Sequence, residues 1–466
     1  MIDIPLSKTI HFIGIGGCGM SALARILIQK GYAVSGSDLK ENTAILRLKD
    51  MGATIYLKHD EMHVRKADVI VVSTAIRPDN CEFIKAKSDC LPIYHRSEIL
   101  AMIMAEFATR IAVAGTHGKT TTTAMMARVL DILGVSPTYV IGGEMVDFKC
   151  NSSLGSSHYA VAEADESDGS FLNLNPTVSI VTNVEAEHMD YYGTEAVLRN
   201  AFLVFMSKAI DNNGMIVVNQ DDELLFKATA GFPRSQVVTY GVSTDAQVQA
   251  KHIRFMPTGV CYDLVYDGKE LGAVQLKVFG MHNVSNSLAI FAYGLCSGFS
   301  FKAIADGVCQ FSGTKRRFQH IGHQHGVDVY DDYGHHPTEI ETTLKGIKNS
   351  FGRRLICIFQ PHRFSRTRDL IDVFPTCFGD ADEVIITDIY SANEPNPDKL
   401  TSQAIVDRMT ESERAKTVFI PHKSDIAHHL VMSIKDGDMV ITMGAGDIHT
   451  VGTELLQQLR LKDAQS

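Results

Sequence analysis

Three stretches of the chain share one pattern, in which a short β-branched run ends in a turn and apolar residues at helical spacing follow. The first run begins at Thr9 and turns at Gly14, the second begins at Arg110 and turns at Gly115, and the third begins near Arg353. Each unit is typical of a strand and the helix that follows it in a parallel sheet. The pattern therefore predicts an α/β protein with three sheets.

Further apolar runs of strand length complete these sheets. We expect the additional strands at 33–37, 68–73, 159–164, 178–183, 383–388 and 439–443. Helical spacing after the second turn predicts a helix at 122–133.

Residues 237–278 follow a different pattern, because apolar and polar residues alternate there. The stretch contains the dipeptides Thr258-Gly259 and Asp267-Gly268. Dipeptides with glycine in the second position are typical of hairpin turns. We therefore expect antiparallel hairpins inserted in the middle of the chain.

A chain of 466 residues corresponds to about three domains at the usual ~150 residues each. The predicted boundaries near 108 and 313 separate an N-terminal Rossmann-like parallel sheet, a central P-loop-type ATPase sheet with the antiparallel insertion, and a C-terminal Rossmann-like domain. The expected domains are 1–108, 109–313 and 314–466.

Composition excludes several classes of protein. A formal charge of −10 and a pI near 6.0 disfavour a nucleic-acid surface, which needs clustered basic residues. Nine cysteines without a C-x-x-C pair indicate thiols in a reducing compartment. No stretch resembles a signal peptide or approaches the ~18 apolar residues of a membrane span, so we expect a cytoplasmic protein without membrane contact.

The first turn reads Gly14-Ile-Gly16-Gly17-Cys-Gly19, and Asp38 ends the next predicted strand. Backbone amides at the start of a helix can face a pyrophosphate, and the carboxylate can bind a ribose hydroxyl. From this pattern alone the ligand is NAD or FAD, or another diphosphate, or the turn holds no ligand.

The second turn reads Gly115-Thr-His-Gly118-Lys119-Thr120-Thr121, with Val113 where a full P-loop has its first glycine. A lysine at this position reaches β- and γ-phosphates, and the threonine hydroxyls can bind Mg²⁺. Two phosphate loops imply two nucleotides, or one nucleotide and one nucleotide-linked substrate.

Two acidic segments, at 163–168 and 185–190, follow the next two predicted strands of the middle region. The carboxyl ends of parallel strands share one edge of a sheet, where a cation that bridges phosphates needs oxygen ligands. Taken alone, such segments are more often solvated loops; beside Lys119 we interpret them as a metal site.

Five ordered segments resemble the successive motifs of the Mur ligases: 115–123, 163–168, 183–190, 280–286 and 316–318. This resemblance implies ATP binding by Gly115, Thr116, His117, Gly118, Lys119, Thr120, Thr121, Asn183, His282, Asn283, Asn286, Arg317 and Asp332. It also implies that Thr120 and Glu163 hold one Mg²⁺ and that His188 holds a second. Many members carry a carbamylated lysine past that histidine, whereas this chain has no lysine at 191–207.

Two C-terminal segments, 331–339 and 359–368, resemble the Mur ligases that add the first amino acid, L-alanine, to UDP-N-acetylmuramate. The resemblance implies an amino-acid site at Tyr333, His335, Arg363 and Arg366. The two arginines are three residues apart, so a helix would let both face a carboxylate or developing phosphate charge; the alternative is a basic helix end. The same resemblance assigns the UDP-sugar to Gly14, Gly16, Gly17, Gly19, Ser37, Asp38 and Ser73.

The expected reaction passes through an acyl phosphate that L-alanine then attacks. The implied catalytic residues are Lys119, Glu163, His188, His335, Arg363 and Arg366. ATP and one or two Mg²⁺ ions, with Mn²⁺ as a substitute, are the expected cofactors of a monomer or weak homodimer. The alternatives are a recycling ligase that adds a peptide to the same UDP-sugar, a nicotinamide-dependent oxidoreductase, and a P-loop switch protein.

Overall fold

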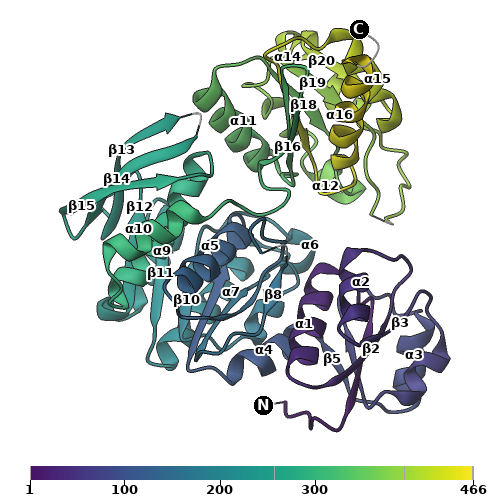
Figure 1. Cartoon of the computed structure of the whole chain (residues 1–466), viewed down its shortest axis with the longest axis vertical. Coiled ribbons are helices and arrows are strands. Elements are labelled where there is room, and N and C mark those ends of the chain that lie inside the picture. Colours follow the sequence, from purple (N-terminus) through teal and green to yellow (C-terminus); the bar gives the residue numbers. More distant parts are fainter. Residues whose placement is uncertain (1, 149, 257, 393, 464–466) are drawn as a thin grey trace. The chain divides into compact units, whose positions relative to one another are not determined.

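The computed structural model describes residues 2–148, 150–256, 258–392 and 394–463. The chain divides into two compact units. Unit 1 comprises Met1–His252, Tyr262–Gln275 and Ser285–Ser312, and unit 2 comprises Ile253–Cys261, Leu276–Val284 and Gly313–Ser466. The described residues form three sheets, as expected (Figure 1).

The N-terminal sheet has the strand order β3-β2-β1-β4-β5 and is parallel throughout. Its strands are β1 (Thr9–Ile13), β2 (Ala33–Ser37), β3 (Thr54–Tyr56), β4 (Val69–Val72) and β5 (Ile93–His95), and its helices are α1 (Cys18–Gln29), α2 (Thr43–Asp50), η1 (Glu61–Lys66), α3 (Cys81–Ser88) and α4 (Arg96–Ala105). The expected strands β1, β2 and β4 are confirmed. Sequence periodicity missed β3 and β5 because three residues are too few to show a period.

The central sheet has ten strands in the order β15-β14-β13-β12-β11-β10-β6-β9-β7-β8. Its strands are β6 (Thr109–Ala114), β7 (Thr138–Val140), β8 (Ser152–Ser153), β9 (Tyr159–Glu163), β10 (Val178–Val181), β11 (Met215–Asn219), β12 (Val237–Gly241), β13 (Val248–Met256), β14 (Gly259–Tyr266) and β15 (Lys269–Leu276). The accompanying helices are α5 (Lys119–Ile132), η2 (Ser170–Asn173), α6 (Met189–Tyr192), α7 (Glu195–Asp211), α8 (Glu223–Ala228), η3 (Thr229–Gly231), η4 (Arg234–Gln236), α9 (Met281–Cys296) and α10 (Phe301–Gln310). The expected helix at 122–133 begins three residues earlier, so Lys119 lies in its first turn.

The alternating stretch at 237–278 is only partly a set of hairpins. Its first strand, β12, pairs in parallel with both β11 and β13, so the expectation of hairpins from residue 237 onward was wrong. The turn between β14 and β15 does have the predicted form, because Asp267 and Gly268 both have positive φ, 48° and 76°. Two such residues are typical of the type I′ hairpin turn.

The C-terminal sheet has the order β16-β17-β21-β18-β19-β20, and only β16 runs antiparallel to its neighbour. Its strands are β16 (Gln319–Gln324), β17 (Val327–Asp332), β18 (Leu355–Phe359), β19 (Glu383–Ile386), β20 (Thr417–Phe419) and β21 (Met439–Met443). The helices of this region are α11 (Pro337–Phe351), α12 (Phe364–Asp369), η5 (Phe374–Thr376), α13 (Gln403–Asp407), α14 (Glu411–Ala415), η6 (Lys423–Asp425), α15 (Ile426–Ser433) and α16 (His449–Asp463). The sequence prediction omitted β16, β17 and β20.

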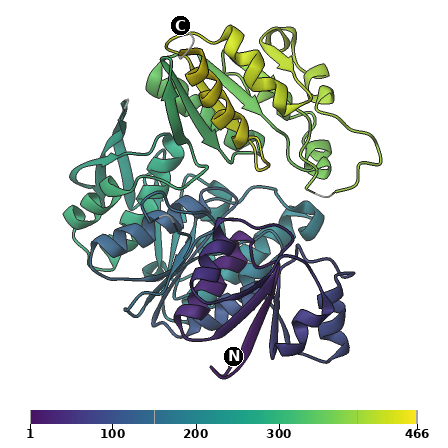
Figure 2. The same cartoon turned by 45° about the vertical axis from the view of Figure 1, so that its right-hand side comes forward.

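Both faces of the C-terminal sheet are buried, and they separate by strand alternation. Leu355, Cys357 and Phe359 of β18 pack in one cluster with residues of α11, whereas Ile356 and Ile358 pack in another with residues of α15 and α16. Figures 1 and 2 show α11 on one face of this sheet and α16 on the other. A strand buried on both sides reads as a continuous apolar run, which explains why β18 was predicted from sequence.

One core cluster of unit 1 includes residues of both its sheets, such as Phe12 of β1 and Ala112 of β6, together with the helix residues Ile103 of α4, Phe171 of η2 and Phe202 of α7. Helix α4 thereby packs against the central part of the unit. Among the described residues, no helix has the length and apolar character that crossing a membrane requires.

A buried carboxylate joins the loops at the carboxyl edge of the N-terminal sheet. Glu82 of α3 is fully buried and accepts a hydrogen bond from the Ser37 hydroxyl. The Nδ1 atoms of His59 and His63 lie 3.1 and 2.7 Å from its two oxygens, and His11 Nε2 lies 3.8 Å away. Burial alone would raise the pKa of Glu82, but the facing donors His11, Ser37 and His63 outweigh burial and lower it to about 2. We call these five residues the Glu82 cluster.

The Glu82 cluster predicts an acid-dependent loss of stability. Because the pKa of Glu82 falls from 4.5 to about 2 on folding, its contribution is present above pH 4.5 and is lost as the pH falls toward 2. We expect Glu82→Gln to reduce the free energy of unfolding at pH 7 by on the order of 2–3 kcal/mol and to flatten its decline below pH 4.5. Urea unfolding followed by circular dichroism between pH 7 and 3 measures this. The control Glu61→Gln changes an exposed carboxylate in η1; equal slopes for wild type and both variants would contradict the prediction.

Candidate active site

Three neighbouring strands of the central sheet, in the order β10-β6-β9, end at the same edge. The phosphate loop at 115–118 follows β6, an acidic loop at 164–168 follows β9, and residues 182–188 follow β10. Parallel strands make this convergence unavoidable. The predicted phosphate, carboxylate and histidine motifs therefore lie together.

The phosphate loop requires its two glycines. Gly115 and Gly118 have φ of 137° and 84°, and a Cβ on Gly115 would lie 2.0 Å from Thr182 Oγ1. Asn183 holds the loop between them, because its carbonyl and its side-chain oxygen accept from the amides of Thr116 and His117, at 3.0 and 2.8 Å. Asn183, predicted to bind ATP, thus supports the backbone of the loop.

Lys119 is a partly buried cation at this edge, with a side chain 14% exposed. Its ammonium group donates to the carbonyls of Gly115 and Thr116, at 2.6 and 3.0 Å, and to Glu166 Oε1 at 2.9 Å. Burial alone would lower the pKa of Lys119, but the negative charges of Glu166 and Asp165 raise it above its usual value. The lysine is therefore charged at neutral pH.

Glu166 is the buried partner of Lys119, with a side chain only 1% exposed. Burial raises its pKa to about 7; the Lys119 charge opposes this shift, and Asp165 adds to it. His188 belongs to the same group, because its Nε2 lies 3.8 Å from Glu166 Oε1 and 3.6 Å from Glu187 Oε2. Sequence reasoning recognised the acidic segment but did not single out Glu166, since only the fold shows which carboxylate faces the lysine.

Thr120 and Glu163 form a second group of oxygen atoms at the start of α5. The Thr120 hydroxyl donates to Glu163 Oε1 at 3.0 Å, and the Gly142 amide donates to Glu163 Oε2 at 2.7 Å. A threonine hydroxyl beside a carboxylate is the kind of donor set that Mg²⁺ binds together with phosphate oxygens. These residues therefore fit the expected metal. His188, as an imidazole next to two carboxylates, offers ligands of a different kind.

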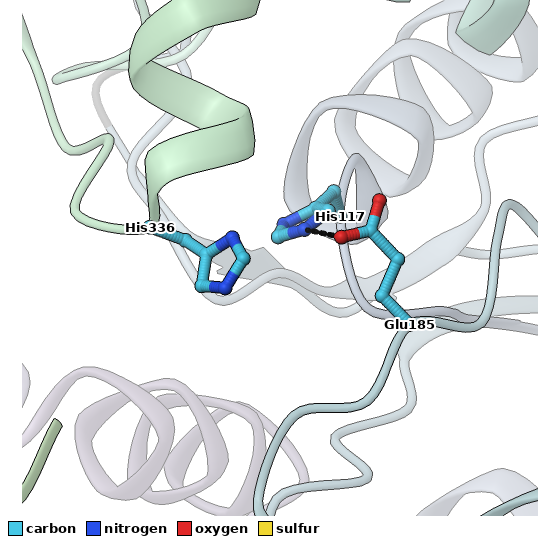
Figure 3. A group of neighbouring side chains, drawn as sticks. All are labelled: His117, Glu185 and His336. Atoms are coloured by element: carbon cyan, nitrogen blue, oxygen red, sulfur yellow. Dashed lines mark hydrogen bonds and ion pairs between the residues drawn. The ribbon is translucent and has the colours of Figure 1, made fainter. Parts of the chain in front are cut away.

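Two further side chains border the phosphate loop. His117 Nε2 lies 3.4 Å from Glu185 Oε2, and Figure 3 shows the two side chains directed at each other. A Cβ on Gly118 would lie 2.6 Å from Asn286 Oδ1, so Asn286 of α9, predicted to bind ATP, touches the loop. Thr121 is buried in the first turn of α5.

Most backbone amides of the N-terminal glycine loop donate hydrogen bonds to acceptors within the protein. Gly14 (φ 81°) and Ile15 donate to the Ser37 carbonyl, Gly16 donates to Asp38 Oδ2 at 2.9 Å, and Gly17 donates to the Gly14 carbonyl. The amides left to face a ligand are therefore those at the start of α1, which have no acceptor within the helix.

Two of the residues predicted to bind the UDP-sugar differ in exposure. The Ser37 side chain is buried in the Glu82 cluster, whereas Ser73 is partly exposed just after β4. The structure thus places Ser37 behind the surface of this edge.

In unit 2, Asp332 is a buried carboxylate at the end of β17. It accepts from the amides of Phe318 and Gly334, at 2.7 and 2.6 Å. Burial raises its pKa to about 6 against the lowering effect of Arg317. The Arg317 side chain lies over the Tyr333 ring, 5.4 Å from its centre, and 3.4 Å from Glu339 Oε1.

His282 and Asn283 begin α9 in the same unit. His282 is partly buried, and burial and the Arg317 charge lower its pKa to about 4, so its ring is neutral at physiological pH. The Asn283 amide donates to the Phe279 carbonyl at 2.7 Å and lies 3.1 Å from His282 Nε2. Both predicted residues therefore lie near Arg317 in unit 2.

The start of α11 positions His335. Its Nδ1 lies 3.0 Å from the Tyr333 carbonyl, and its amide donates to Glu339 Oε2 at 3.0 Å. Glu339 also closes a capping box with His336. Sequence reasoning missed this role of Glu339, although a capping-box glutamate three residues into a helix is a recognisable signal.

Arg363 begins α12 in a strained conformation, with φ 72° and ψ 138°. Arg366 lies in the last turn of that helix. His362 directly precedes Arg363, and its ring stacks on the ring of Tyr390. Burial, followed by the charges of nearby basic residues, lowers the pKa of His362 to about 3. Because Arg363 lies at the helix N-terminus, the alternative of a basic residue at a helix C-terminal end does not apply to it.

Together these features define an α/β protein with a lysine-bearing glycine loop and facing carboxylates at one sheet edge, an arrangement typical of nucleotide-dependent enzymes. Residues 9–108 match the family described as "Mur ligase family, catalytic domain", residues 113–294 match "Mur ligase middle domain", and residues 316–446 match "Mur ligase, glutamate ligase domain". The chain belongs to the Mur ligase family.

Individual relatives align with almost the whole length of the chain. The UDP-N-acetylmuramate–L-alanine ligase of Pelotomaculum thermopropionicum is 44% identical over 97% of this chain and 98% of its own length. The crystal structure of the UDP-N-acetylmuramate-alanine ligase MurC from Thermotoga maritima has a TM-score of 0.84 at 30% identity, covering 98% of this chain and all of that one. A murein peptide ligase from Psychrobacter arcticus has a TM-score of 0.72 at 25% identity, covering 97% and 98% of the two chains.

The strain at Arg363 predicts an unusual order of stabilities. Arg363→Gly and Arg363→Ala both remove the guanidinium, but only glycine adopts this backbone conformation without cost. We expect the glycine variant to be about 1 kcal/mol more stable than the alanine variant in urea unfolding.

The matched control is Arg366, which lies inside α12. There the order should reverse, because glycine within a helix costs about 1 kcal/mol relative to alanine. The same order at both positions would contradict the assignment of strain to Arg363.

Proposed function

We propose that the protein joins L-alanine to the carboxylate of UDP-N-acetylmuramate in an ATP-dependent reaction of peptidoglycan precursor synthesis. The observation that carries this proposal is the partly buried Lys119 hydrogen-bonded to the phosphate loop, with the Thr120–Glu163 oxygen pair beside it. A ligase needs this arrangement because a carboxylate does not acylate an amine at neutral pH. It must first become a better electrophile.

In the proposed reaction, a muramoyl carboxylate oxygen attacks the γ-phosphorus of ATP and ADP leaves. The resulting acyl phosphate is attacked by the neutral amine of L-alanine, and the tetrahedral adduct expels phosphate to leave the amide. Lys119 balances the charge that spreads over the transferring phosphoryl group. Its preset position, held by two carbonyls and Glu166, means that little reorganisation is needed as that charge develops.

Thr120 and Glu163 would hold one Mg²⁺, which supplies charge neutralisation at the phosphates. We propose His188 for a second ion, with Mn²⁺ as a substitute metal. The nucleotide would contact the loop at 115–121, with Asn286 beside it, and the residues His282, Asn283, Arg317 and Asp332. A neutral His282 can accept as well as donate a hydrogen bond, which suits recognition of an adenine edge.

For the UDP-sugar we propose the glycine loop, Asp38 and Ser73 as contacts. The buried Ser37 would support this site indirectly, through its hydrogen bond to Glu82. For the amino acid we propose Tyr333, His335, Arg363 and Arg366. The arginines can pair with the alanine carboxylate, and His335 is held by Glu339 and the Tyr333 carbonyl. The functional domains would be 1–108, 109–313 and 314–466, in a cytoplasmic monomer or weak homodimer.

The competing substrate is a peptide, since the murein peptide ligase shares the fold. We expect phosphate release with UDP-N-acetylmuramate and L-alanine, together with a product whose mass equals the sum of the two substrates minus water. The tripeptide L-alanyl-γ-D-glutamyl-meso-diaminopimelate should give less than a tenth of that rate. A coupled phosphate assay with mass spectrometry measures both, and NADH fluorescence titration tests the dinucleotide alternative. Preferred use of the tripeptide would replace the proposal by the recycling activity.

Removal of the Lys119 ammonium should separate chemistry from sugar binding. We expect Lys119→Ala to lower turnover by at least about a thousandfold, while calorimetric binding of UDP-N-acetylmuramate changes less than threefold. The control Lys227→Ala removes an exposed lysine that pairs with Glu223 and should leave both quantities unchanged. Equal loss of turnover and sugar binding in the Lys119 variant would contradict two separate sites.

A further inference from the structure

Arg96 is a cation at the proposed UDP-sugar site that the sequence did not point to. It is the first residue of α4, directly after the carboxyl end of β5. Its Nη2 donates to Asp165 Oδ2 at 2.7 Å. Its Nη1 faces the glycine loop, because it lies 3.4 Å from the position that a Cβ on Gly19 would take. One guanidinium therefore touches the acidic loop and the start of α1 at once.

The position of Arg96 is fixed by its neighbours on both sides. His95 caps α4 and forms a capping box with Glu98. The Asn173 amide of η2 donates to the Ser97 hydroxyl at 2.8 Å, which ties the first turn of α4 to the segment after the acidic loop. The side chain is thus presented on a rigid helix start, and little conformational entropy remains to be lost when a ligand binds.

The glycine loop itself supplies little positive charge. The amides of Gly14, Ile15, Gly16 and Gly17 are bonded within the protein, so the start of α1 contributes partial charges only. The side chains nearest to the other glycines of the loop are those of Ile76, Asp38, Asn42, Ile45 and Met20. None of these is a cation, and Asp38 is an anion. Two phosphate charges at this place need a further positive group.

We propose that Arg96 binds the diphosphate of the UDP-sugar, with Asp165 orienting its guanidinium. An arginine fork suits this role because it can serve a carboxylate with one nitrogen and a phosphate oxygen with another. Asp165 lies in the loop that follows Glu163 and carries Glu166. Arg96 thereby connects the sugar-nucleotide loop with the loop beside Lys119, and it holds the diphosphate in a fixed relation to the proposed phosphoryl-transfer site.

This inference rests on the proposed function, because the ligand is the diphosphate of that reaction's UDP-sugar. Calorimetry with UDP and with UDP-N-acetylmuramate, and chemical-shift titration with uridine, test it. We expect Arg96→Met to weaken UDP and UDP-N-acetylmuramate by a similar factor of about 10 to 100, and to leave uridine affinity unchanged. Arg96→Lys should recover part of the loss, since it keeps the charge without the fork.

The matched control is Arg199→Met, which removes an arginine paired with Glu195 on α7 and should leave all three affinities unchanged. Asp165→Asn keeps the cation but removes its anchor, so it should weaken UDP by less than Arg96→Met does. A loss confined to UDP-N-acetylmuramate would overturn the assignment in favour of the muramoyl carboxylate, and unchanged UDP binding would reduce Arg96 to a structural contact. The amide product of the wild-type protein tests the proposed function separately, because it does not depend on these affinities.

Discussion

The active edge of the central sheet depends on one partly buried charge, the Lys119 ammonium. A lysine removed from water is stable only where oxygen atoms replace its hydration. Here two loop carbonyls and Glu166 do so, and this fixes the conformation of the loop, the first turn of α5 and the acidic segment together. Burial raises the pKa of Glu166 against the lowering effect of the Lys119 charge, whereas Glu166 and Asp165 raise the pKa of Lys119 and keep it charged.

In both units the candidate site residues cluster at the carboxyl ends of adjacent parallel strands. In unit 1 these are β10, β6 and β9; in unit 2 they are β17, β21 and β18, which end at Asp332, Met443 and Phe359. Arg316 joins two of the latter ends, because its side chain bonds to Asp331 and to the Gly444 carbonyl. Residues distant in sequence are thus gathered by strand order alone, and the loops determine the chemistry.

The sequence predicted those structural features that depend only on residues close together in the chain. The long buried strands, the glycine turns and the Lys119–Thr120 pair are recognisable because each consists of consecutive residues. Three-residue strands and the polar hairpin of β16 and β17 carry too little periodicity to be predicted. Contacts between distant positions were also missed, such as Arg96 with Asp165, 69 residues apart, and the Glu82 cluster, since no local pattern says which polar residues will be buried together.

Three residues near the candidate sites have backbone conformations that favour glycine, as do several other non-glycine residues of the described chain. His188, Arg316 and Arg363 all have positive φ, at 57°, 61° and 72°, where glycine would fit without cost. Such conformations cost on the order of 1–3 kcal/mol each and persist where the surroundings impose them. The Tyr191 and Tyr192 amides bind the His188 carbonyl, and the Arg363 amide donates to the Tyr390 carbonyl. Glycine at these positions would relieve the backbone but would remove an imidazole or a guanidinium, so the strain is tolerated only where the surrounding hydrogen bonds hold the backbone in place.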